Sequence, residues 1–216
     1  MKKKDIKKMN IVIVILIIIL IIFGGIAILR DYFKKAKNYY TYKGVNDEYT
    51  FETFKIENKT FHLIRVYAGE DSEVKEYKIS LHYGPYEVED IHMEDNLKDK
   101  VIKDWIYLTQ DPDLQNRTGG RALLALLEVG RVTGTSDYGV YKISTQAAFT
   151  MENEEVKSVP VKNCSNANKN IAVVEVRLGN ETKVYSENEC VIIMGKDREE
   201  LVKAADKLTL HLLGVF

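Results

Sequence analysis

The segment from Asp111 to Arg121 holds residue types and spacings that suit chemistry. If it leaves the carboxyl end of a parallel strand and leads into a helix, it lies where open α/β sheets bind ligands. Carboxylates there can bind a cation or act on a substrate, and the N–H groups at a helix start attract anions. The candidate ligand-binding residues are Asp111, Asp113, Thr118, Gly119 and Gly120. A turn followed by a helix start explains the same residues without a ligand, and the segment lacks the GxxxxGK[ST] and GxGxxG phosphate-binding patterns.

A second group of metal-ligand residue types lies between positions 82 and 95. If this segment is extended, Glu87 and Glu89 face away from His82, so the spacing does not assemble a ligand set. We therefore expect a solvated acidic connection, with no metal and no cofactor. The group comprises His82, Glu87, Glu89, Asp90, His92, Glu94 and Asp95.

Nucleophilic catalysis has no support in the sequence. No serine lies in a GxSxG elbow, and no histidine lies close in sequence to either cysteine. We find no catalytic motif and favour a chain that is not an enzyme.

Cys164 and Cys190 are the two cysteines of the chain. In a domain outside the cytoplasm an even count indicates one disulfide, which would close a loop of about 25 residues and contribute about 3 kcal/mol. In a cytoplasmic protein the same residues would be unpaired apolar side chains of a core.

The amino-terminal region has the pattern of a membrane anchor. Residues 1–10 form a basic tail with five lysines, and residues 11–29 contain no charged side chain. A transmembrane helix of this length matches the hydrocarbon core of a bilayer, which is about 30 Å thick. The alternative is a secretory signal cleaved after Gly25-Ile26-Ala27. The apolar run continues beyond that triplet and favours an uncleaved signal anchor.

The flanking charges do not orient this span, because five basic residues lie on each side of it. The short basic tail favours a cytoplasmic amino terminus. The cysteines and four N-glycosylation sequons favour an extracytoplasmic domain, although polar loop composition also explains the sequons. The candidate glycosylated residues are Asn58, Asn116, Asn163 and Asn180.

Charge is distributed unevenly along the chain. Residues 1–43 hold ten basic and two acidic side chains, and the remainder holds 21 basic and 30 acidic ones. Because phosphate backbones and anionic lipids repel an acidic domain, we expect no nucleic-acid partner. The expected partners are the lipid bilayer around the anchor and other envelope proteins. Residues 30–43 are basic and aromatic and are predicted to form a juxtamembrane stalk.

Residues 44–216 are numerous enough for one domain with its own core. Alternating apolar and polar residues predict strands at 49–56, 60–67 and 74–83, joined by short turns into an antiparallel meander. Further strands are predicted at 105–109, 138–143, 147–151, 171–178, 182–185 and 190–194. Gly179 and Asn180 have the chemistry of a hairpin turn between the strands that flank them.

Two helices complete the predicted α+β fold of mixed α/β layers. The central helix, from about 120 to 129, is apolar nearly all round, so we expect it to be buried between layers. The carboxyl-terminal helix begins after Asp197, with Glu200 completing a capping box, and Gly214 ends it. Its apolar stripe consists of Leu201, Ala205, Leu208 and Leu212. This stripe predicts packing on the sheet, and docking on a partner protein is the alternative.

The segment CVIIMGKDREELVKAADKLTLHLLGVF, together with residues 105–131, resembles the carboxyl-terminal region of uncharacterised archaeal envelope proteins that are membrane-anchored and lie outside the cell. The resemblance implies no catalytic residues. We therefore predict a single-pass protein of the cell membrane whose exterior domain acts in binding or assembly. The alternatives are a membrane-tethered enzyme that uses the 111–121 loop and a cytoplasm-facing membrane adaptor.

Overall fold

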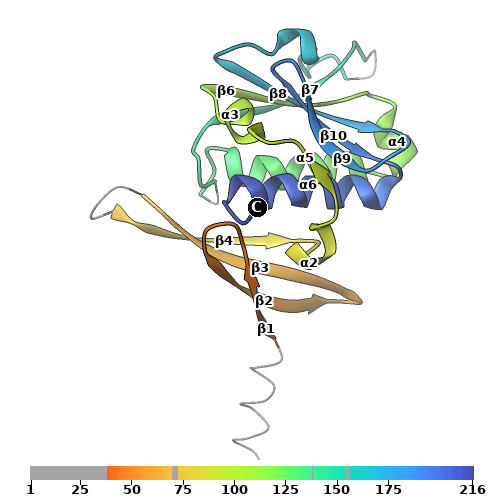
Figure 1. Ribbon diagram of the computed structural model, residues 1–216. Helices are drawn as coiled ribbons and strands as arrows, with labels where there is room; N and C mark the ends of the chain where they lie inside the picture. The colour runs from red at the N-terminus through yellow and green to blue at the C-terminus, as the bar shows by residue number, and fades with distance from the viewer. Residues whose placement is uncertain (1–37, 70–72, 138, 154–155) are drawn as a thin grey trace, which may run out of the picture. The chain divides into compact units, whose positions relative to one another are not determined.

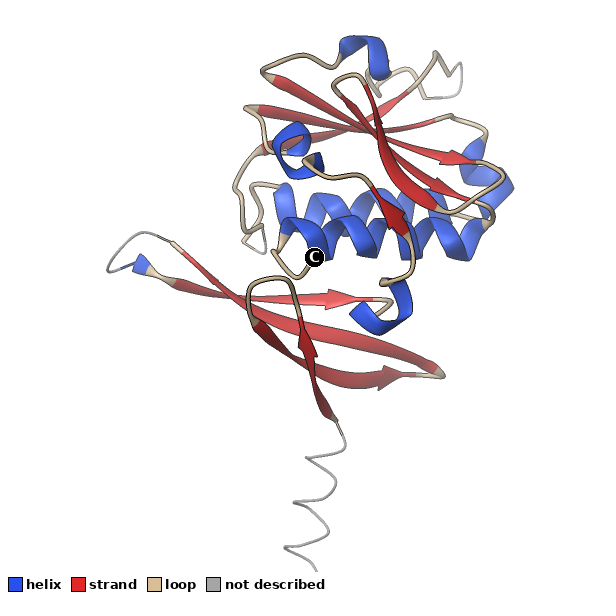
Figure 2. Ribbon diagram, in the orientation of Figure 1, coloured by secondary structure: helices blue, strands red, loops and turns tan. Residues whose placement is uncertain are grey.

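The computed structural model describes residues 38–69, 73–137, 139–153 and 156–216. The chain divides into two compact units, Met1–Tyr40 and Thr41–Phe216. The predicted basic tail, the transmembrane helix and most of the stalk lie outside the described residues. Within the described ranges, no helix is both long and apolar enough to cross a membrane. The fold is mixed α+β, with one antiparallel and one mixed sheet (Figure 1, Figure 2).

The first sheet is an antiparallel meander with strand order β1-β2-β3-β4. Its strands are β1 (Tyr39–Lys43), β2 (Glu48–Ile56), β3 (Lys59–Ala68) and β4 (Lys75–Leu81). Phe51, Ile64 and Ile79 lie opposite one another across β2, β3 and β4, and all three are buried. The three predicted strands are therefore confirmed. The structure adds β1, which lies in the segment that the sequence assigned to the stalk.

The second sheet has six strands in the order β5-β9-β10-β8-β6-β7. They are β5 (His92–Met93), β6 (Trp105–Gln110), β7 (Ser144–Phe149), β8 (Ile171–Leu178), β9 (Lys183–Glu187) and β10 (Cys190–Gly195). Strand β6 pairs in parallel with both β7 and β8, and β8 pairs in parallel with β10. Because β8 is central and covered on both faces, residues 172–176 are all buried.

Two long helices, α5 (Arg121–Thr133) and α6 (Arg198–Leu212), lie between the two sheets (Figure 1). They cover the face of the six-stranded sheet that carries Ile106, Val174 and Val191 and form the main hydrophobic core with it. The short helices are α2 (Pro85–Val88), α3 (Leu97–Val101), α4 (Leu114–Thr118) and the 3₁₀ turn η2 (Cys164–Asn166).

Helix α6 agrees with the sequence in its start, its stripe and its end. The Asp197 side chain accepts hydrogen bonds from the backbone N–H groups of Glu199 and Glu200. The Glu200 carboxylate bonds Lys203, so the N-cap is formed as predicted but the second half of the capping box is not. The predicted stripe of Leu201, Ala205, Leu208 and Leu212 is fully buried. Gly214 follows with a φ of 87°, a left-handed conformation that suits glycine.

The central helix lies between the two sheets as predicted (Figure 1), but only one of its faces is fully buried. Ala122, Ala125 and Val129 of α5 are fully buried, but Leu123 and Leu127 are 37% and 53% exposed. Helix α6 packs against α5 along one side (Figure 1), and the two leucines face away from the core. An apolar sequence on all sides therefore does not mean burial on all sides.

The predicted hairpin at Gly179 and Asn180 is wrong. Strand β10 lies between β8 and β9, and the hairpin joins β9 to β10 through Asn188, which has a φ of 56°. Gly179 instead allows the Met194 side chain to pack against the backbone, because a Cβ at this position would lie 2.3 Å from Sδ of Met194. Local turn chemistry does not decide which strands become neighbours.

The predicted strand at 138–143 is also wrong over the described residues 139–143, which form no strand. The N–H groups of Val140 and Tyr141 bond the carbonyl of Val132, and the N–H group of Ile143 bonds the carbonyl of Thr133. These residues therefore donate hydrogen bonds to the last carbonyl groups of α5 and do not extend the sheet. The neighbouring strand, predicted at 147–151, is β7 and lies three residues earlier at its start.

Candidate functional site

The predicted ligand-binding loop lies at the carboxyl end of β6, and its strand has parallel neighbours as expected. Two of its polar side chains, those of Asp111 and Thr118, bond within this segment. Asp111 accepts a hydrogen bond from the N–H of Asp113, at 2.8 Å. The buried hydroxyl of Thr118 donates to the carbonyl of Leu114 and accepts from the N–H of Ala122.

Gly119 and Gly120 form the turn between α4 and α5, with φ angles of 59° and 81°. The loop is thus a connection between two helices. Ligand binding at its five candidate residues remains a prediction.

Arg121, the last residue of the predicted segment, lines a pocket that the other residues of the segment do not line. A pocket of about 260 Å³ lies between the four-stranded sheet and the amino-terminal ends of α5 and α6. It is lined by Lys59, Thr60, His82, Tyr83, Glu87, Arg121 and Glu199. We refer to this cavity as the sheet–helix pocket.

His82 is the residue of this pocket with the most distinctive surroundings. Its Nδ1 lies 2.8 Å from Oε1 of Glu128, a carboxylate on α5 that is 0% exposed. The Arg131 guanidinium is 3.5 Å from the same Oε1 and also bonds the carbonyl of Ser80 on β4. A buried carboxylate at Nδ1 fixes the orientation of an imidazole ring and leaves Nε2 as the nitrogen available to other groups.

Asp206 of α6 is a second fully buried carboxyl group beside His82. It accepts a hydrogen bond of 2.8 Å from the N–H of Tyr83. Burial and the charge of Glu128 raise the pKa of Asp206 well above its ordinary value.

The opposite wall of the pocket carries paired charges. Arg121, the first residue of α5, forms an ion pair at 3.0 Å with Glu199, the second residue of α6. The Tyr83 hydroxyl donates to Glu199 at 3.1 Å. Burial and this carboxylate raise the pKa of Tyr83 to about 12. His62 lies 2.9 Å from Glu87, and burial lowers the pKa of His62 despite that carboxylate.

The pocket therefore presents an imidazole that contacts a buried carboxylate, Glu128, behind the pocket lining. Such a set can hold and transfer a proton and can bind a polar ligand. Sequence reasoning identified His82 and Glu87 but placed them in a solvated connection, and it missed Glu128 and Asp206. The signal that could have identified Glu128 and Asp206 is the presence of a charged residue within the apolar face of each helix.

Two other acidic residues of the predicted metal-ligand group, Glu89 and Glu94, bond to separate partners. Glu89 accepts a hydrogen bond from the hydroxyl of Tyr42, and Glu94 accepts two from Ser186. The hydrogen bonds from Ser186 lower the pKa of Glu94. These residues lie along a connection between the two sheets and do not converge on one point.

The predicted disulfide between Cys164 and Cys190 is confirmed, with the two Cα atoms 5.1 Å apart. It joins η2 to β10 on the face of the six-stranded sheet opposite the helices, where Val173 and Ile192 pack beside it. Among the described residues, Glu175 and these cysteines also form a group of close metal-ligand atoms, but both sulfurs are in the disulfide.

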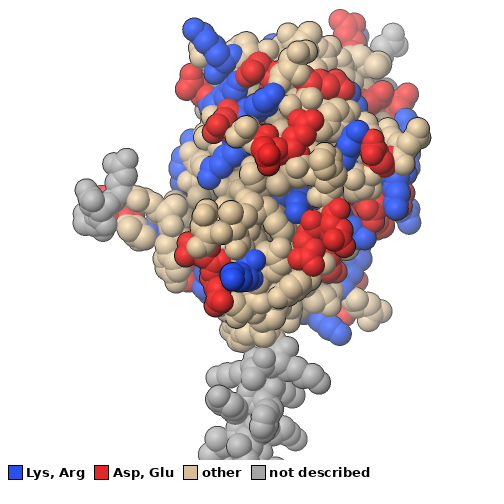
Figure 3. All heavy atoms as spheres, in the orientation of Figure 1, with Lys and Arg blue, Asp and Glu red and all other residues tan. Residues whose placement is uncertain are grey.

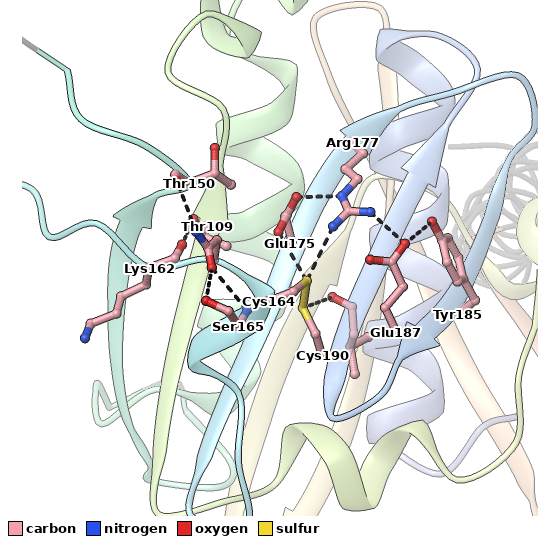
Figure 4. A network of polar contacts seen from close by, with 12 residues as sticks. Thr109, Thr150, Lys162, Cys164, Ser165, Glu175, Arg177, Tyr185, Glu187 and Cys190 are labelled. Atoms are coloured by element: carbon pink, nitrogen blue, oxygen red, sulfur yellow. Dashed lines mark hydrogen bonds and ion pairs between the residues drawn. A yellow bond between two sulfur atoms is a disulfide. The ribbon is translucent and has the colours of Figure 1, made fainter.

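Polar groups surround the disulfide (Figure 4). The Arg177 side chain lies between two carboxylates, bonding Glu175 at 2.5 Å and Glu187 at 2.8 Å. The same guanidinium is 3.4 Å from Sγ of Cys164. Glu175 is only 7% exposed, so Arg177 neutralises a nearly buried charge.

The four candidate glycosylated asparagines differ in how exposed their side chains are to solvent. Asn58, Asn116 and Asn180 are exposed. Asn163 is half-buried, caps η2 by accepting from Ser165 and donates to the carbonyl of Thr150. Asn163 is therefore the least suitable acceptor of the four.

Comparisons with known protein families, with curated proteins and with solved structures found no match. The interpretation of the site therefore depends on the chemistry of the chain itself.

Proposed function

We propose that this chain is a single-pass membrane protein whose carboxyl-terminal domain lies outside the cell membrane and acts in binding or assembly. The disulfide is the observation that carries this proposal. Disulfides form and persist in oxidising compartments, and a signal anchor with a cytoplasmic basic tail delivers the rest of the chain to such a compartment. The resemblance to archaeal envelope proteins supports the same location.

The charges of the domain favour protein partners. Acidic and basic side chains are interspersed on the face shown in Figure 3, as is common for protein surfaces that do not bind phosphate backbones. The acidic excess of residues 44–216 also keeps the domain away from anionic lipid. Other envelope proteins are therefore the proposed partners, with the bilayer around residues 11–29.

Binding is favoured over chemistry because the polar groups of the two candidate sites already bond one another. The 111–121 loop uses Asp111 and Thr118 for its own turns. Among the residues that line the sheet–helix pocket, Arg121 is paired with Glu199, and Glu87 is paired with His62 outside the lining.

Cysteine labelling tests the location. Asn46 lies in the exposed turn between β1 and β2, and the native disulfide leaves no free thiol in the described residues. Asn46→Cys should react with a membrane-impermeant maleimide in intact cells, whereas Lys3→Cys should react only after permeabilisation. The reverse pattern would support the cytoplasm-facing adaptor and refute an exterior domain.

Release from the anchor tests assembly. A specific protease site inserted after Lys37 would separate the domain from the proposed transmembrane helix. If the domain is held by other envelope proteins, it should stay in the sedimented envelope after cleavage. Complete release into the supernatant would contradict an assembly role, and a chain without the inserted site controls for non-specific cleavage.

A tethered acid–base enzyme is the second candidate function, because His82 lines a pocket and is oriented by a buried carboxylate. The purified full-length chain would be assayed with chromogenic esters and glycosides. Turnover that His82→Gln abolishes without a change in melting temperature would support the enzyme. No turnover, or turnover that survives the substitution, would remove this candidate.

A further inference from the structure

Two sulfur atoms and one carboxylate converge on the face of the six-stranded sheet opposite the helices (Figure 4). Sγ of Cys164, Sγ of Cys190 and a carboxylate oxygen of Glu175 all lie within 4.8 Å of one another. Three separate elements, η2, β10 and β8, contribute them. Two cysteines, a third protein ligand and a water molecule are the donor set of a tetrahedral zinc site with an open position.

The carboxylate of Glu175 has one oxygen without a donor. Its Oε1 bonds Arg177, but its Oε2 lies 3.2 Å from Sγ of Cys164, and a sulfur in a disulfide carries no proton to donate. Among the described residues Oε2 has no other partner, although Glu175 is only 7% exposed. An unsatisfied oxygen of a nearly buried carboxylate is costly. The disulfide form therefore leaves a position beside the sulfur that a cation can fill.

Arg177 orients this carboxylate through its other oxygen. The guanidinium bonds Oε1 of Glu175 at 2.5 Å and lies 3.4 Å from Sγ of Cys164 (Figure 4). In metal sites the ligating carboxylates and thiolates are commonly held by such hydrogen bonds from neighbouring groups. Arg177 is therefore placed to support two ligands of a metal ion without taking the position of the ion.

A metal form would have the same net charge as the disulfide form. With the disulfide closed, the carboxylates of Glu175 and Glu187 and the guanidinium of Arg177 give the network one net negative charge. Opening the disulfide to two thiolates adds two negative charges, and a Zn²⁺ ion adds two positive ones. The ion therefore removes the cost of burying uncompensated thiolates, which would be high at Cys190 because that residue is 0% exposed.

The distances fit a zinc site once the bond between the sulfurs is broken. Zn–S bonds of about 2.3 Å and a Zn–O bond of about 2.1 Å place tetrahedral ligands about 3.6 Å apart for sulfur and oxygen and about 3.8 Å apart for two sulfurs. The distance from Sγ of Cys164 to Oε2 of Glu175, 3.2 Å, is close to the first value. Two covalently bonded sulfurs cannot reach the second value, so the site requires the reduced chain.

We propose that Cys164, Cys190 and Glu175 bind one Zn²⁺ ion when the disulfide is reduced, with water as the fourth ligand. A dithiol reductant supplies two electrons and two protons to the disulfide and becomes a cyclic disulfide itself. The ion then displaces the two thiol protons to solvent and forms two Zn–S bonds and one Zn–O bond. Cys164 is partly exposed, so the reductant and the ion reach the site from its side.

This inference goes beyond the proposed binding role and does not depend on the proposed location. In an oxidising compartment the disulfide form persists, and the metal form requires a reductant. Failure of the metal site would leave the exterior location intact, because cysteine labelling tests that location separately. Failure of the exterior location would likewise leave the metal site intact.

Cobalt spectroscopy tests the ligands directly. The full-length chain in detergent micelles would be reduced with a phosphine, which supplies no competing thiolate, and titrated with Co²⁺ without oxygen. The reduced wild type should bind one Co²⁺ with a thiolate-to-cobalt charge-transfer band and the visible bands of tetrahedral cobalt, and Zn²⁺ should displace it. The oxidised chain should show no such bands. Absence of the charge-transfer band in the reduced wild type would overturn the proposal.

Matched glutamate variants test the third ligand. Glu175→Gln should weaken Co²⁺ binding by at least about 10-fold, because an amide oxygen is a poorer ligand than a carboxylate. Glu189→Gln is the control, since Glu189 is exposed, precedes Cys190 in sequence and bonds Lys103. Its affinity for Co²⁺ should equal that of the wild type. Equal affinities of Glu175→Gln and the wild type would refute the role of Glu175.

Thermal unfolding keeps the proposal testable if reduction loosens the domain. Because an ion that binds only the folded state stabilises it, Zn²⁺ should raise the melting temperature of the reduced chain but not of the oxidised one. If the reduced chain is unfolded without metal, Zn²⁺ should restore its circular dichroism spectrum. A reduced chain that Zn²⁺ neither stabilises nor refolds would contradict the proposed site.

Discussion

At the scale of single residues, the charged side chains that lie inside the fold are each held by a specific partner. Arg177 neutralises Glu175 on one face of the six-stranded sheet, and His82 and Arg131 contact Glu128 on the other side of the helix layer. Burying a charge is expensive unless it is paired, so removing one partner should be more harmful than removing an exposed pair.

Arg177→Met should therefore lower the free energy of unfolding by about 2 kcal/mol, because it leaves the carboxylate of Glu175 nearly buried without a cation. Urea unfolding of the full-length chain in micelles, followed by the fluorescence of Trp105, measures the change. Adding Glu175→Gln should restore part of the loss by removing the uncompensated charge.

Arg198→Met is the matched control for that substitution. Arg198 is also paired with a glutamate, at 3.9 Å, but its side chain is 66% exposed. Its loss should change stability by less than about 0.5 kcal/mol, because solvent screens the pair. Equal effects of the two substitutions would show that Arg177 contributes no more than a surface cation.

At the scale of elements, the contacts that join strands and helices are partly covalent and partly apolar. The disulfide ties η2, and with it the long connection from β7 to β8, to the centre of the sheet. The stripe of α6 packs this helix against the same sheet from the other side.

Reduction of the disulfide should destabilise the chain by about 3 kcal/mol, because the bond closes a loop between residues 26 positions apart. Melting curves with and without a reductant measure this difference. The double variant Cys164→Ala with Cys190→Ala should melt at the same temperature in both conditions. Sensitivity of that variant to the reductant would mean that the loss has another origin.

Leu208→Ala in α6 should lower the free energy of unfolding by about 2–5 kcal/mol, because it opens a cavity in the core. Leu127→Ala in α5 is the control, since Leu127 is half-exposed and its loss should change stability by about 0.5 kcal/mol or less. Chemical denaturation of both variants decides the comparison. A large effect at Leu127 would instead indicate that this exposed face is covered in solution.

At the scale of the whole molecule, residues 41–216 form a layer of helices between two sheets. The end of β4 and the residues after it are bound to the helices by the partly buried hydrogen bonds of Ser80, His82 and Tyr83. Phe51, Ile64, Ile79 and Leu81 add apolar contacts on its inner face.

We therefore expect both sheets to unfold in a single transition. Trp105, the one tryptophan of the chain, reports on the six-stranded sheet. A second chain with Trp105→Phe and Phe54→Trp would report on the four-stranded sheet. Coincident midpoints in urea support one cooperative unit, and earlier loss of the Phe54→Trp signal would show that the four-stranded sheet is held weakly.

Features that depend on neighbours in sequence could be predicted from the sequence. The period of Leu201, Ala205, Leu208 and Leu212 predicted the buried face of α6, and the strand patterns predicted β2, β3, β4 and β8. The count of two cysteines predicted their bond. Such signals are local because helix and strand periods and capping bonds extend over a few residues only.

The order of the strands and the assembly of the pocket were decided only by the tertiary structure. Gly179 and Asn180 favour a hairpin, yet β10 is placed between the two strands because its apolar residues are buried better at the centre of the sheet. His82 meets Glu128 across 46 positions, and Tyr83 meets Asp206 across 123. The amino-terminal residues 1–37 determine the proposed membrane anchor through their composition alone, whereas the buried acid pair exists only because packing of α5 on α6 removes both carboxyl groups from water.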